Sequence, residues 1–358
     1  MTLPLPTTAR PESASGPLPG TTAGRPARGS RLGRGAALGA ALGLLAASLL
    51  AGLAWGSQTI PFGDVVAALT GHDGSEAAAI VREMRWPRTV VAVVVGAALG
   101  LAGAQLQSVT RNPLAEPGLL GVAAGAALGV VLVATLSTGS AGVTRAAAAV
   151  VGAALATVLV LVLAGGAGRG PLPLVLAGVA VTAMISAVTS VLVLLDAATL
   201  DEYRFWVVGS VAGRALTDLV PVLPLLVLGG LLAVTGTRTL DLLALGDELA
   251  AGLGARVASG RLAVLVSATL LTAGAVAVAG PLVFVGLVVP HVARALVGPS
   301  HRWLLPTSAV LGACLLVLAD VVGRVVARPA ELQVGIVTAV IGAPVLIVLV
   351  QRRRLVRS

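Results

Sequence analysis

The stretch LAVLVSATLLTAGAVAVAGPLVFVGLVVPHVA, residues 262–293, contains no acidic or basic residue other than one histidine over 32 positions. A membrane-spanning helix needs about 20 predominantly apolar residues, so a single helix does not account for this length. Gly280 and Pro281 lie in the middle of the stretch, and proline removes a backbone donor and disrupts a helix. We therefore expect two spans here, at 262–279 and 281–297.

The rest of the chain repeats this apolar pattern. The chain is 57% hydrophobic and 11% charged over 358 residues, whereas soluble domains are about 45–50% apolar and about 25% charged. These values argue against a soluble enzyme, a nucleic-acid binder or a secreted disulfide scaffold. They predict an all-α integral membrane protein with about ten transmembrane helices. The other expected spans are 35–63, 89–110, 118–144, 146–168, 170–195, 219–237, 303–319 and 332–351.

The net charge of +9 arises from 24 arginines, with no lysine, against 15 acids. If both termini are cytoplasmic, the inner side holds 16 arginines and 5 acids and the outer side 8 arginines and 10 acids. The positive-inside rule favours this orientation. We expect a disordered Arg/Pro-rich cytoplasmic arm at 1–33, a transmembrane domain at 34–351 with its longest inner loop at about 237–261, and a basic cytoplasmic tail at 352–358.

Small residues recur at four-residue spacing on several expected helices. In lipid, such stripes let helix backbones approach closely enough for dispersion to hold them together. In a chain this rich in alanine and glycine, chance accounts for any single stripe as well as helix packing does. The stripes comprise Gly35, Gly39 and Gly43; Gly121, Gly125 and Gly129; and Gly96 with Gly100.

Residues with catalytic or metal-binding chemistry are scarce. The three histidines, His72, His291 and His301, form no cluster with metal-ligand spacing, and no glycine-rich phosphate loop is present. We expect no catalytic residue, no metal site and no cofactor in this chain. Acids within the spans are also few, which weakens an ion-coupled carrier. Asp320 is the main candidate for that role, but a helix pair with Arg324 is the favoured interpretation.

Three polar islands interrupt the apolar pattern. On the expected outer side, VREMRWPRT (81–89) holds Arg85 and Arg88 at the mouth of a span, against the positive-inside bias, which suggests docking of an acidic partner. On the inner side, RNPLAEPGLLG (111–121) is typical of a rigid turn. The inner loop 237–261 has the pattern of short amphipathic helices broken at Gly246 and Gly254. Its acids favour a partner protein over the anionic inner leaflet.

Several motifs occur in one order over about residues 38–351. They are Arg85-Trp86-Pro87-Arg88, Gln107 with NPLAEPGLLG, FWVVGS (205–210), LALGDELAAGLG (243–254), GPLVFVGLVVPHVARALVGPSHRWLLPTSAVLGA (280–313), ADVVGR (319–324) and ELQVGIVTAVIGAPV (331–345). Together they resemble the permease subunits of type II ABC importers for iron-siderophores, haem and cobalamin. The chain departs from that family in its long N-terminal arm and in Gln333, where proline is more usual.

The resemblance implies a type II ABC importer permease fold and an ATP-driven importer, with ferric siderophores as the first choice of substrate and cobalamin or haem as alternatives. It implies a second permease chain in a homodimer or heterodimer, two ATPase subunits that bind ATP and Mg, and an extracytoplasmic substrate-binding protein. The expected location is a bacterial plasma membrane. No nucleic-acid partner is expected.

The resemblance also implies roles for particular residues. The docking residues are Arg85, Arg88 and Arg324. The ATPase coupling loop comprises Leu245, Gly246, Asp247, Glu248, Ala251, Leu253 and Gly254. The translocation pathway, within about 172–210, includes Val188, Val191, Trp206, Gly209 and Ser210. The structural turn contains Asn112, Pro113 and Pro117.

Two other functions stay open on the sequence alone. A secondary carrier driven by an ion gradient would transport without ATP or a binding protein. An intramembrane enzyme would use His291 as its base, whereas the permease interpretation makes His291 a structural residue near the inner face.

Overall fold

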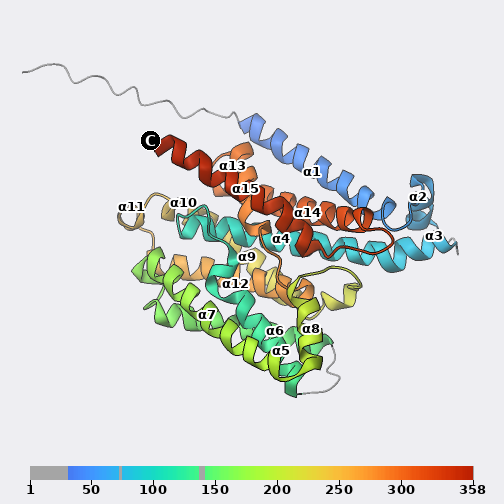
Figure 1. Cartoon of the computed structure of the whole chain (residues 1–358). Helices are drawn as coiled ribbons and strands as arrows, with labels where there is room; N and C mark the ends of the chain where they lie inside the picture. The colour runs from blue at the N-terminus through green and yellow to red at the C-terminus, as the bar shows by residue number, and fades with distance from the viewer. Residues whose placement is uncertain (1–30, 72–74, 137–141, 358) are drawn as a thin grey trace, which may run out of the picture.

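The structure, a computed structural model, describes residues 31–71, 75–136 and 142–357 of the chain. Throughout these ranges the regular structure is helical (Figure 1). The longest helices are α1 (Arg31–Ala54), α4 (Trp86–Val109), α6 (Gly142–Leu163), α7 (Pro171–Leu195), α12 (Val257–Ala279), α14 (His301–Val326) and α15 (Val334–Arg357). The shorter ones are α2 (Phe62–Thr70), α3 (Glu76–Ala79), α5 (Val122–Leu136), α8 (Ala197–Val207), α9 (Leu223–Thr235), α10 (Thr237–Leu243), α11 (Asp247–Gly252) and α13 (Val285–Val297).

Six of the described helices are long and apolar enough to cross a membrane, or up to seven if α9 and α10, bent by 56°, form one broken span. Three more apolar helices are shorter, at Val122–Leu136, Val285–Val297 and Val334–Val348. Each expected span overlaps one of these helices or the bent pair, so the all-α membrane fold is confirmed. Helix length and composition alone give six or seven full spans, so the predicted number of about ten crossings stays a prediction.

The break predicted at Gly280 and Pro281 is present. Helix α12 ends at Ala279, and Gly280 has a φ of 73°, a left-handed conformation that glycine adopts without a steric penalty. Helix α13 begins only at Val285, because 281–284 are not helical and Phe284 also has a positive φ of 69°. The two expected spans are therefore separate helices, and the second starts four residues later than predicted.

Helical structure extends beyond both ends of the expected transmembrane domain. Helix α1 begins at Arg31, so the last residues of the expected arm are helical. The remainder of that arm, 1–30, lies outside the described residues. Helix α15 continues to Arg357 through the expected tail.

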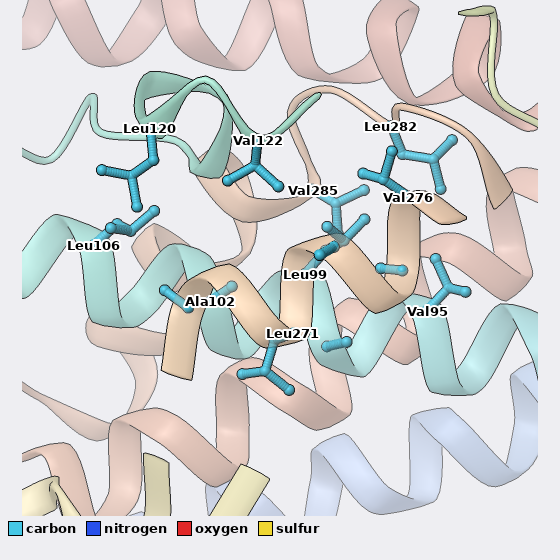
Figure 2. Close-up of a cluster of buried hydrophobic side chains, with 14 of the residues drawn as sticks. Val95, Leu99, Ala102, Leu106, Leu120, Val122, Leu271, Val276, Leu282 and Val285 are labelled. Atoms are coloured by element: carbon cyan, nitrogen blue, oxygen red, sulfur yellow. The ribbon is translucent and has the colours of Figure 1, made fainter. Parts of the chain in front are cut away.

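Helices α4 and α12 form the centre of the molecule. The apolar windows of their spans are 72% and 78% buried, against 28–33% for α1, α6 and α7. Helix α4 packs against α12, α13 and α14. Figure 2 shows the buried side chains where α4 meets its neighbours; they are Val95, Leu99, Ala102 and Leu106 of α4 with Leu120, Val122, Leu271, Val276, Leu282 and Val285.

The glycine stripes divide into packed and unpacked examples. A Cβ added to Gly96 would lie 2.4 Å from the carbonyl oxygen of Gly312, and one on Gly125 would lie 2.3 Å from that of Gly152. Those glycines therefore permit close backbone contact, as the spacing predicts. The stripe of Gly35, Gly39 and Gly43 on α1 has no neighbouring atom within 4 Å of the added Cβ.

Gly103 gives a direct test of this packing. We expect Gly103→Val to lower the thermal stability of the purified protein, because its Cβ would lie 2.0 Å from the carbonyl oxygen of Gly286. Overpacking of this kind costs about 1–3 kcal/mol. Gly39→Val is the matched control, since it meets open space. Equal melting temperatures for the two variants in the same detergent would contradict the assignment.

The long helix α4 connects two polar ends of the molecule, about 36 Å apart at about 1.5 Å per residue over 24 residues. We call them the α2 end and the α11 end. At the α2 end, the start of α4 lies beside the last turns of α1 and α14. At the α11 end, the last turn of α4 lies beside α10 and the start of α14. Figure 1 shows α2 and α3 at one extreme and α10 and α11 at the other.

Candidate functional site

A cluster of three arginines and two acids lies at the α2 end. Arg88, in the first turn of α4, contacts Asp320 of α14 through Nη2 at 2.7 Å and through Nε at 3.0 and 3.1 Å. Arg324, one helical turn beyond Asp320, pairs with the same carboxylate at 3.1 Å. Asp320 is thus shared by two arginines. The expected helix pair of Asp320 with Arg324 is present, but the contact with Arg88, 232 residues away, was not predicted.

Glu331, in the connection between α14 and α15, completes the cluster. Its Oε2 accepts a hydrogen bond from Arg88 Nη1 at 2.7 Å. The side chain of Glu331 is 34% exposed, whereas that of Asp320 is 3% exposed. One acid of the cluster is therefore interior and the other lies at its rim.

Arg85, which the family resemblance places among the docking residues, is buried. Its Nη1 donates to the carbonyl oxygens of Leu53 at 2.7 Å and Ala54 at 2.8 Å, and its Nη2 donates to that of Gln58. The last carbonyls of a helix have no partner within the helix, so Arg85 satisfies those at the end of α1. Arg85 therefore fixes α1 and the following loop against the start of α4.

A cavity of about 220 Å³ opens onto this cluster. Arg324 lines the cavity, is 2% exposed, and donates from Nη1 to the carbonyl oxygen of Gly52 at 3.0 Å. Its Nε has no hydrogen-bond partner among the described residues. This Nε is itself buried, so the unpaired donor lies inside the protein behind the cavity wall. The remaining lining residues are Gly56, Ser57, Gln58, Ile80, Met84, Arg85, Arg88 and Glu331.

At the α11 end, loop 237–261 forms the two short helices that its pattern predicts. Gly246 (φ 113°) separates α10 from α11, and Gly254 (φ 82°) follows α11. Leu240, Leu243 and Ala250 are buried against the protein. The opposite face of the loop is exposed and carries Leu245, Glu248, Leu249, Ala251 and Leu253.

Asp247 fastens α11 to the rest of the protein. Both of its carboxylate oxygens accept from Arg261 Nη2 at 2.8 Å, and Oδ1 also accepts from Arg111 Nη2. The Arg261 hydrogen bond lowers the pKa of Asp247 below its ordinary value, so this carboxylate is ionised at neutral pH. Arg261 is fully buried and also donates to the carbonyl oxygen of Ala167 at 2.8 Å. Asp247 therefore positions the loop, while its neighbour Glu248 faces outward.

His301 provides a second connection between the loop and the spans. Its Nδ1 lies 2.6 Å from Asp241 Oδ1 of α10, and its Nε2 lies 2.6 Å from Ser108 Oγ of α4. The backbone N–H of His301 also donates to Asp241 at 3.0 Å. Three elements thus meet at one buried side chain. No local sequence pattern predicts this contact, because the three residues lie far apart in the chain.

The segment 111–121 forms a turn that supports the same end. Asn112 Oδ1 accepts from the N–H of Leu114 at 2.9 Å, Pro113 is half-buried, and Pro117 is buried against Gly286. Glu116 Oε1 accepts from the N–H of Phe284 at 2.8 Å, and burial raises the pKa of its carboxyl. The turn thereby ties the end of α4 to the break before α13.

The residues expected along the pathway fall into two groups. Val188 and Val191 are exposed on α7. Trp206 instead packs against the core, and Gly209, with a φ of 78°, is buried against the carbonyl of Pro281. The Ser210 N–H donates to the carbonyl oxygen of Ala279 at 2.7 Å. Within this chain, FWVVGS joins α8 to α12 and α13, so burial makes Gly209 a packing residue rather than an exposed one.

The other titratable candidates have local partners or lie outside the described residues. His291 Nδ1 contacts the carbonyl oxygen of Leu287, one turn earlier in α13, at 2.8 Å, which fits a structural role. Cys314 is buried. His72 falls outside the described residues. In the ranges 31–71, 75–136 and 142–357, no group of three or more His, Cys, Asp or Glu is placed to hold a metal ion.

Comparison with known proteins decides the family. Residues 44–352 match the FecCD transport family. The chain belongs to the FecCD transport family. It is 43% identical over 300 residues to the ferric enterobactin transport system permease protein FepD of Escherichia coli (strain K12), covering 83% of this chain and 90% of that protein. It is 40% identical to the cobalamin import system permease protein BtuC of Halobacterium salinarum, covering 84% and 80%.

A solved structure supports the same conclusion. A metal-chelate type ABC transporter in an inward-facing conformation matches with a TM-score of 0.78 and 29% identity, over 89% of this chain and 99% of that one. The predicted membership of this permease family is confirmed. This FecCD-family chain is an ABC transporter permease subunit and not an enzyme.

Proposed function

We propose that this permease subunit imports metal chelates, with ferric siderophores as the substrate class, in an ATP-driven importer. The observation that carries this proposal is the FecCD family match over residues 44–352, together with relatives named for ferric enterobactin, siderophore and iron–citrate transport. The same family match accommodates haem and cobalamin, which relatives at similar identity are named for.

The complete importer contains this chain, a second permease chain, two ATPase subunits that bind ATP and Mg, and an extracytoplasmic binding protein. It lies in the plasma membrane of a bacterium with both chain termini in the cytoplasm. The charge distribution supports this orientation, because the α11 end carries the arginine-rich loops and the α2 end carries most of the acids.

The binding protein docks at the α2 end. The cluster of Arg85, Arg88 and Arg324 with Asp320 and Glu331 carries a net charge of +1 and opens into a cavity. Arg324 lines that cavity together with Arg85 and Arg88. Complementary charges speed association and fix orientation more than they add affinity. Arg88 and Arg324 receive a carboxylate, and Arg85 holds the wall of the cavity in place.

The ATPases engage the α11 end. The exposed face of Leu245, Glu248, Leu249, Ala251 and Leu253 presents leucines and an acid on a short helix. Such a helix fits a groove on a partner protein. The contacts of Asp247 and Asp241 with Arg261 and His301 transmit its movement to α12 and α14.

The substrate passes between the two permease chains. Helix α7 exposes Val188 and Val191, which give a neutral, weakly binding wall. A bulky chelate must leave such a pathway as readily as it enters. Trp206, Gly209 and Ser210 support this wall from behind by joining α8 to α12.

Reconstitution tests the function. Proteoliposomes with the permease, its ATPase and its binding protein are expected to take up one ferric siderophore from a panel that also contains ferric citrate, haem and cobalamin. Uptake should stop when ATP, the ATPase or the binding protein is omitted. Uptake that follows an ion gradient without those partners would establish a secondary carrier instead. Retained uptake in His291→Ala is the corresponding control against an enzyme that needs this histidine.

A further inference from the structure

Glu331 differs from Asp320 in its place within the α2-end cluster. Asp320 is buried and contacts both Arg88 and Arg324. Within the described part of the chain, Glu331 hydrogen-bonds to Arg88 at 2.7 Å from the rim of the cavity. Asp320 therefore acts as a fixed interior counter-ion, while Glu331 is free to leave Arg88 without creating a buried unpaired acid.

The backbone around Glu331 is held in place, so movement is confined to its side chain. The N–H of Leu332 donates to the carbonyl oxygen of Gly323 at 3.0 Å, and that of Gly335 donates to Gly209 at 3.1 Å. A Cβ on Gly335 would lie 1.8 Å from the carbonyl oxygen of Val208, which shows how closely this segment packs. With its backbone held in this way, the Glu331 side chain can rotate between Arg88 and water.

The geometry points to Glu331 as an internal competitor for the arginine that receives the binding protein. In the free permease, Glu331 occupies Arg88 Nη1, and a carboxylate of the binding protein displaces it on docking. This inference rests on the docking function proposed above. The cluster rises from +1 to +2 when Glu331 leaves or is neutralised, which strengthens attraction for an acidic surface. Glu331 thus weakens docking and favours release after substrate delivery.

Glu331→Gln tests this inference, because glutamine keeps the size and the acceptor oxygen while removing the charge. The assay uses the whole permease in nanodiscs and the purified binding protein that supports uptake in the reconstitution above. We expect binding to tighten about three- to tenfold at low salt, with faster association and with a smaller gain at high salt. Glu83→Gln, an exposed acid in the segment before α4, is the matched control and should change affinity less than twofold.

Arg88→Gln and Arg324→Gln separate this inference from the docking function itself. If either arginine variant weakens binding while Glu331→Gln leaves it unchanged or weaker, the competitor role is wrong and docking stands. If neither arginine variant alters binding at low salt, the docking surface is wrong as well. Melting temperatures near that of the parent protein would show that each variant is folded.

Discussion

Replacing Asp320 by asparagine is expected to lower the melting temperature of the purified permease by roughly 5–10 °C. Asp320 is the only acid of the α2-end cluster that contacts both Arg88 and Arg324, and all three side chains are mostly buried. Removing one partner of a buried ion pair costs about 3–5 kcal/mol, because it leaves an uncompensated charge in a region of low dielectric. Thermal unfolding in one detergent, followed by tryptophan fluorescence, measures the shift.

Two further variants make this prediction specific. Asp64→Asn removes an exposed acid from α2 at the same end of the molecule and should leave the melting temperature unchanged. The double variant with Asp320→Asn and Arg324→Met removes the pair together and should recover part of the lost stability. A melting temperature for Asp320→Asn equal to that of the Asp64→Asn control would contradict the central role of Asp320.

The helices were predictable because their signals are local. A run without charges, a Gly-Pro pair at 280–281 and the glycine breaks of the inner loop each specify structure within a few residues of themselves. The four-residue stripes were only partly informative. Gly96 and Gly125 meet a facing backbone, whereas Gly39 meets none within this chain. Spacing predicts a smooth helix face but does not say which helix covers it.

The sequence predicted which polar segments belong to the candidate site, but it did not predict the side-chain contacts within that site. Arg88 and Arg324 were expected at one surface, yet the carboxylate that joins them became evident only when α4 lay beside α14. Arg85 was expected to face a partner, and instead it satisfies the carbonyls at the end of α1. Such contacts depend on helix packing, which local composition does not determine.

Reversing the charge of Glu248 is expected to reduce ATP-dependent uptake by more than tenfold while leaving the melting temperature unchanged. Glu248 lies on the exposed face of α11 beside Leu249, which is 63% exposed. We expect the groove that receives an acidic, leucine-bearing helix to be basic, so a lysine at this position should be repelled from it. Like charges across an interface cost several kcal/mol. Reconstituted uptake, stimulated ATP hydrolysis and co-purification of the ATPase measure the effect.

Asp247→Asn distinguishes contact with the ATPase from support of the loop. This variant removes the negative charge that pairs with Arg261. Because Arg261 is fully buried, it is left without a counter-charge, and both uptake and melting temperature should fall. Glu83→Lys, an equal charge reversal at the α2 end, should leave co-purification of the ATPase intact. Normal ATPase stimulation in Glu248→Lys would remove α11 as the coupling element. A melting temperature lowered as far as that of Asp247→Asn would show instead that Glu248 supports the fold.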